Sequence, residues 1–147
     1  MKTLFALCAT TGLLLSASNT AMADDQSPER IAARCVDAID DTVDRCAHAA
    51  AEETHECVRE IRRLLAAGRI RAAHRVARAC VRSATDRTEH CADRVELICD
   101  VCIDILLDMG EPQLARRVNN ACNDAIERLR SILQREKNAI RTALGGT

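Results

Sequence analysis

The chain has 147 residues, of which 29% are charged and only one, Phe5, is aromatic. Its formal net charge is −1 at pH 7, so the overall charge balance indicates neither a nucleic-acid partner nor a membrane surface. Because almost no aromatic ring is available to stack on bases, we expect no sequence-specific nucleic-acid binding.

Residues 1–23 have the features of a secretory signal peptide. Lys2 precedes an apolar run at 4–15, and small residues then lead to an A-x-A pattern that ends at Ala23. The apolar run is shorter than the ~20 residues that span a bilayer. Cleavage after Ala23 would remove Cys8 and the single aromatic residue, and it predicts a periplasmic or extracellular protein with no transmembrane segment.

The predicted mature chain contains no Phe, Tyr or Trp, so its core must be built from small and aliphatic side chains. Small side chains bury little area each, and covalent cross-links are a common substitute. An even number of cysteines in an exported chain predicts a disulfide framework. The eight that remain are Cys35, Cys46, Cys57, Cys80, Cys91, Cys99, Cys102 and Cys122.

After a short tail at 24–27, the first predicted helix has Ser27 as its N-cap and Pro28 in its first turn. It runs to about residue 67, where Gly68 suits the left-handed position that ends a helix. The second helix is predicted over about 69–109 and ends at Gly110. Its weakest part is 83–88, where the sequence leaves a kink or a break open.

The third predicted helix runs from Pro112 to about Leu144, followed by a tail at 145–147. Gly68 and Gly110 each precede a cysteine by 12 residues, within similar Ala-Arg-Val patterns, which indicates an internal repeat of one helix and its glycine turn. The sequence therefore predicts an all-α domain at 28–144, with three long helices in an antiparallel up-down-up bundle stapled by disulfides.

The cysteine spacing predicts which cysteines are paired. Residues 11 apart lie on one face of an α-helix, because 11 residues exceed three full turns by only ~20°. Three pairs, taken from the outside inward, share a midpoint beside Gly68, as facing residues of an antiparallel hairpin must. A fourth pair has its midpoint beside Gly110. The predicted bridges are 35–102, 46–91, 57–80 and 99–122.

Two other interpretations of the cysteines remain as alternatives. Cys99 and Cys102 form a C-x-x-C motif, typical of redox proteins of the thioredoxin type, although the chain shows no strand pattern around it. The cysteine-rich helical sequence is also superficially similar to bacterial copper storage proteins, which would imply Cu(I) held by reduced thiols. Cysteines 11 apart on one helix would be ~16 Å apart, too far to share an ion.

No catalytic motif is present in the sequence, and we expect no enzymatic activity, no cofactor and no metal site. The distribution of charge is more informative, because residues 59–82 contain eight arginines and a single acid, Glu60. These residues surround the first glycine turn, and the third helix should return Arg135, Lys137 and Arg141 to the same end. The candidate anion-binding pole is Arg59, Arg62, Arg63, Arg69, Arg71 and Arg75.

The sequence identifies no specific partner. A basic pole favours an acidic protein or an anionic envelope component, and self-association is a further alternative. The function predicted at this stage is that of an exported, non-enzymatic structural or binding protein.

Overall fold

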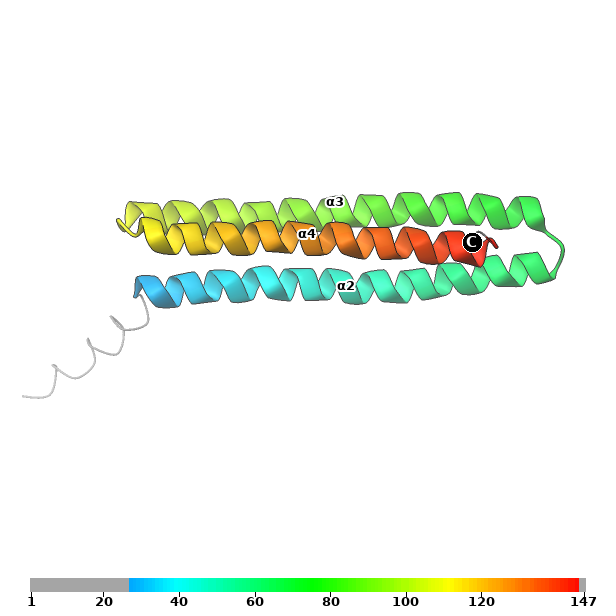
Figure 1. Ribbon diagram of the computed structural model, residues 1–147, viewed down its shortest axis with the longest axis horizontal. Coiled ribbons are helices and arrows are strands. Elements are labelled where there is room, and N and C mark those ends of the chain that lie inside the picture. The colour runs from blue at the N-terminus through cyan, green and yellow to red at the C-terminus, as the bar shows by residue number, and fades with distance from the viewer. Residues whose placement is uncertain (1–26, 146–147) are drawn as a thin grey trace, which may run out of the picture.

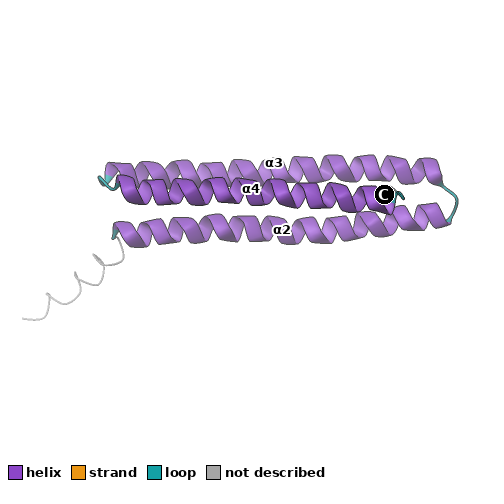
Figure 2. Ribbon diagram, in the orientation of Figure 1, coloured by secondary structure: helices purple, strands orange, loops and turns teal. Residues whose placement is uncertain are grey.

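The computed structural model describes residues 27–145. They form three helices, α2 (Pro28–Ala66), α3 (Ile70–Asp108) and α4 (Pro112–Ala143), which lie side by side in an up-down-up order (Figures 1 and 2). Each helix contacts the other two. The prediction of an all-α antiparallel bundle is confirmed. The predicted signal peptide at 1–23 lies outside the described residues.

Both turns are made by glycine in the left-handed conformation. Gly68 has φ +68° and Gly110 has φ +76°. At the first turn the amide of Gly68 donates to the carbonyl of Leu65, and the amide of Arg69 donates to that of Leu64, both at 2.9 Å. This Schellman pair satisfies carbonyls that a helix end otherwise leaves unpaired. The second turn has the same pair of bonds at Gly110, so the chain reverses direction at each of the two glycines.

Helix α3 continues without a break through 83–88, the segment that the sequence left open. The hydroxyls of Thr85 and Thr88 donate to the carbonyls of Val81 and Ala84, each at 2.9 Å. Ala84 is buried in the bundle. These bonds satisfy the threonine hydroxyls inside the helix, so neither hydroxyl needs a partner elsewhere.

All eight cysteines of the described chain are bridged, in the four pairs that the spacing predicts: 35–102, 46–91, 57–80 and 99–122. Three bridges join α2 to α3, and the fourth joins α3 to α4. The Cα–Cα distances are 6.1–6.4 Å, within the usual range of about 4.4–6.8 Å. Cys99 and Cys102 therefore belong to different bridges.

The apolar core is divided into two clusters. The larger one includes Ile39, Val43 and Val95, and the smaller one, near the first turn, includes Ile61 and Ile140. Aliphatic, alanine and cysteine side chains build both. Such short side chains allow helices to approach closely, which the bridges require.

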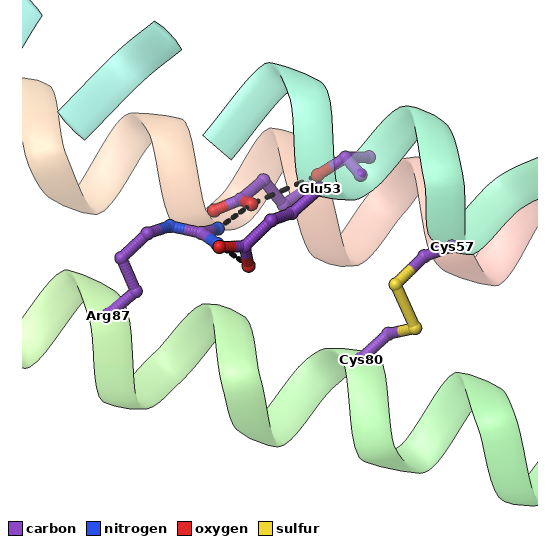
Figure 3. The surroundings of a disulfide bond; sticks show 6 residues. Glu53, Cys57, Cys80 and Arg87 are labelled. Carbon is purple, nitrogen blue, oxygen red and sulfur yellow. Dashed lines mark hydrogen bonds and ion pairs between the residues drawn. A yellow bond between two sulfur atoms is a disulfide. The ribbon is translucent and has the colours of Figure 1, made fainter. Parts of the chain in front are cut away.

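A polar layer separates the two clusters. The Arg87 side chain of α3 bonds to the carboxylates of Glu53 on α2 and Glu136 on α4 (Figure 3). The Thr54 hydroxyl donates to Glu136 Oε1 at 3.0 Å. Glu136 is only 5% exposed, so the bonds to its Oε1 replace part of the hydration that its carboxylate loses on burial. This buried ion pair was not among the features predicted from the sequence.

Candidate functional site

The six residues of the basic pole are all exposed, around the turn that joins α2 to α3. The last two turns of α2 contribute Arg59, Arg62 and Arg63, and the start of α3 and the residue before it contribute the others, which are Arg69, Arg71 and Arg75. Two helix ends meet here, so charges that are separated by several residues in sequence become neighbours at one end of the bundle (Figure 1). The concentration of like charge makes this end a candidate site for anions.

One member of the basic pole has an internal partner. Arg63 makes two bonds to Glu60, each 2.7 Å long. The hydrogen bond from Arg63, together with the nearby charges of Arg63, Arg69 and Arg59, lowers the pKa of Glu60 below its usual value. Glu60 therefore stays ionised at neutral pH and offsets one positive charge, and the remaining arginines carry the net charge of the pole.

Beside the basic pole, a groove of about 480 Å³ lies between α3 and α4. Its floor is apolar and its rim is cationic. The floor residues are Ala77, Val81, Ile140 and Leu144, the rim cations are Arg78, Arg82, Lys137 and Arg141, and His74 also lines the rim. No acidic residue lines this groove. We refer to it as the α3–α4 groove.

Two other depressions on the described chain have different chemistry. One lies between α2 and α4, is lined mainly by alanines, and contains Glu136 and Arg135. The other follows α2 and contains Asp41, Asp44 and Glu52. Both contain carboxylates, so an anion would meet repulsion there. Among these three depressions, the α3–α4 groove is the one that combines apolar and cationic lining.

The end of the bundle opposite the basic pole is richer in acidic residues. Arg128 of α4 donates to Asp40 at 2.5 Å and to Asp44 at 2.8 Å, and so ties α4 to α2. Near this end, the exposed face of α3 carries acids and also apolar side chains such as Leu97 and Val101. The described rod therefore has a basic end and a more acidic end.

The described side chains were also compared with the requirements of a metal site. Within residues 27–145, no group of three or more His, Cys, Asp or Glu side chains is placed to hold one. The two cysteines of the C-x-x-C motif face different helices, because Cys99 bonds to α4 and Cys102 bonds to α2.

Across residues 27–145, no helix has both the length and the apolarity needed to cross a bilayer.

The sequence anticipated the cations of this end but not the groove. Lys137 and Arg141 line the same groove as Arg78 and Arg82, so α4 does return positive charge to this end. Arg135 instead lines the depression between α2 and α4. The floor residues of the groove are aliphatic residues at core spacing, and in the sequence they look the same as residues that are fully buried.

Comparisons with known proteins add no further constraint. The chain matches no family model, and searches among curated proteins and solved structures find no significant match.

Proposed function

We propose that the protein is an exported, non-enzymatic scaffold that binds an anionic envelope surface through its basic pole. One observation carries the proposal: the first turn gathers exposed arginines from two helices, while residues 59–82 contain a single acid, Glu60. Arginine suits such a partner, because its planar fork bonds phosphate and carboxylate oxygens in pairs.

Two features support export. Residues 1–23 have the pattern of a signal peptide. The four bridges are typical of proteins that mature in an oxidising compartment outside the cytoplasm. The Cu(I) alternative needs thiols, whereas the described structure places all eight cysteines in bridges, and no observation favours it.

Rigidity supports binding at the basic pole. The Cys57–Cys80 bridge joins α2 and α3 close to the turn, and Ile61 and Leu64 are buried beneath the arginines. A backbone that is already fixed loses less entropy when it binds, although the arginine side chains still have to be ordered.

The test is co-sedimentation of the oxidised protein with phosphatidylcholine vesicles, with and without phosphatidylglycerol, at low and high salt. We expect binding that needs the anionic lipid and weakens with salt, because exposed charges are screened beyond about 8 Å at physiological ionic strength. The triple variant R69Q/R71Q/R75Q should lose this binding.

The matched control is R94Q/R116Q/R117Q, which removes three exposed arginines away from the basic pole and so changes the net charge equally. An equal loss in both triple variants would show that attraction is diffuse, and the basic pole would not be the site. Retention on an acidic protein or heparin without retention on vesicles would contradict an envelope lipid as the partner.

A further inference from the structure

The α3–α4 groove has a composition that simple charge attraction does not require. A polyanion or inorganic phosphate needs only cations, yet the floor of this groove presents the partly exposed Val81 and Leu144 between them, above the buried Ile140. Water in contact with an apolar floor is released when an apolar ligand covers it, and each methylene buried strengthens binding about fourfold. The floor therefore favours a ligand that has an apolar part.

The rim specifies the other part of the ligand. Arg78 and Arg82 of α3 lie along one side of the groove, and Lys137 and Arg141 of α4 lie along the other. Lys137 is half-buried, and a lysine in such a position commonly packs its aliphatic stem on the protein and keeps its ammonium group in solvent. An anionic group at the rim could contact cations from both helices.

The dimensions limit the size of the ligand. A volume of about 480 Å³ is typical of a site for one small molecule. The apolar floor covers one turn of each helix, from Ala77 to Val81 and from Ile140 to Leu144, while the whole groove extends over residues 74–82 of α3, about 12 Å at 1.5 Å per residue. A groove longer than its apolar floor, with cations along both sides, fits an unbranched acyl chain that carries one anionic group.

We propose that the α3–α4 groove binds one molecule of a single-chain anionic amphiphile, with the acyl chain along the floor and the anionic group among the rim cations. This inference rests on the proposed function, since it names the ligand class taken up beside the basic pole. The shared chemistry is a long alkyl chain with a terminal carboxylate or phosphate monoester.

The test uses the oxidised protein and a dansyl-labelled undecanoate, whose emission rises in an apolar site. The described chain contains no aromatic residue, so protein fluorescence does not interfere. We expect one probe per chain, displaced by laurate below its micelle concentration. Dodecanol should displace at least about tenfold less well, because it lacks the charge, and inorganic phosphate should not displace, because it lacks the chain. Dodecyl phosphate in place of laurate tells which of the two anionic groups is preferred.

Two variants locate the site. K137Q/R141Q should weaken laurate binding about tenfold, whereas R116Q/R117Q, which also removes two positive charges from α4, should leave it within about twofold. V81Q removes part of the floor without changing the charge, and it should weaken laurate binding while the helical content stays the same. Equal effects of the two α4 variants, or displacement by dodecanol as strong as by laurate, would overturn the proposal.

The same variants separate this inference from the proposed function. R69Q/R71Q/R75Q should lose vesicle binding but keep laurate displacement, because none of its three residues lines the groove. Vesicle binding without laurate displacement would refute the groove and leave the basic pole. Laurate displacement without vesicle binding would refute the proposed function and leave the groove.

Discussion

Removing the outermost bridge, Cys35–Cys102, tests whether the stabilisation by one bridge depends on the others that join α2 to α3. We call these three bridges the ladder. Taken alone, it closes 67 residues, whereas Cys99–Cys122 closes 23. Chain entropy then assigns about 4.4 kcal/mol to the first and about 3.4 kcal/mol to the second at 25 °C. On this view the outer bridge should stabilise the fold by about 1 kcal/mol more.

In the oxidised protein the outer bridge closes a smaller loop, because Cys46–Cys91 already joins the same two helices. Cys35 lies 11 residues before Cys46, and Cys102 lies 11 residues after Cys91. The outer bridge therefore closes a ring of about 22 residues, and the same relation gives about 3.4 kcal/mol. The outer bridge and Cys99–Cys122 should contribute equally to the free energy of unfolding.

The variants C35A/C102A and C99A/C122A make the comparison, because the four cysteines are similarly buried, at 6–8% exposure. Guanidinium unfolding followed by circular dichroism, without reductant, should show a loss of about 3.4 kcal/mol in each. A loss about 1 kcal/mol larger for C35A/C102A would refute the ladder and show that each loop acts independently. Losses far below the expected value in both would indicate a denatured state that is already structured.

Two further predictions concern the cysteines and the polar layer. Protein recovered from its native compartment and denatured without reductant should show almost no free thiol, and a count close to eight would instead support Cu(I) storage by thiols. E136A should cost about 3 kcal/mol, because it removes the buried partner of Arg87, while R87M/E136L should recover most of that loss. Thermal and denaturant unfolding of both variants measures this, and a neutral E136A would mean that the ion pair does not stabilise the fold.

The helices and the bridges could be predicted because their signals are local or periodic. Gly68 and Gly110 end helices through a backbone conformation that glycine adopts at little cost. The 11-residue spacing places cysteines on one helix face whatever the surroundings. Together they determine the register of both hairpins, so the pairing follows from spacing without knowledge of the core.

The polar layer and the groove could not be predicted, because both depend on how far each helix is rotated and on how the other two helices cover it. Spacing places Glu136 on the buried stripe of α4, seven residues after Leu129 and four before Ile140, but its partners Arg87 and Thr54 come from the other two helices. Val81 and Leu144 likewise resemble core residues in sequence, while the structure leaves them partly exposed on the floor of a groove. Spacing along one helix does not show which side chains of the other two helices meet it in a chain where 29% of residues are charged.

The position of the polar layer also bears on the proposed function. Arg87 lies between Cys80 and Cys91 on α3, and hence between two bridges of the ladder. It binds α2 and α4 together with α3, whereas the bridges on either side join α2 to α3 alone. The smaller cluster, which includes Ile61 and Ile140, lies beyond this layer. Around it, the Arg87 ion pairs join all three helices, and the Cys57–Cys80 bridge joins α2 to α3. A small aliphatic core of this kind would by itself position the basic pole and the α3–α4 groove loosely, and the bridge and the buried ion pair together keep the backbone beneath both sites in one arrangement.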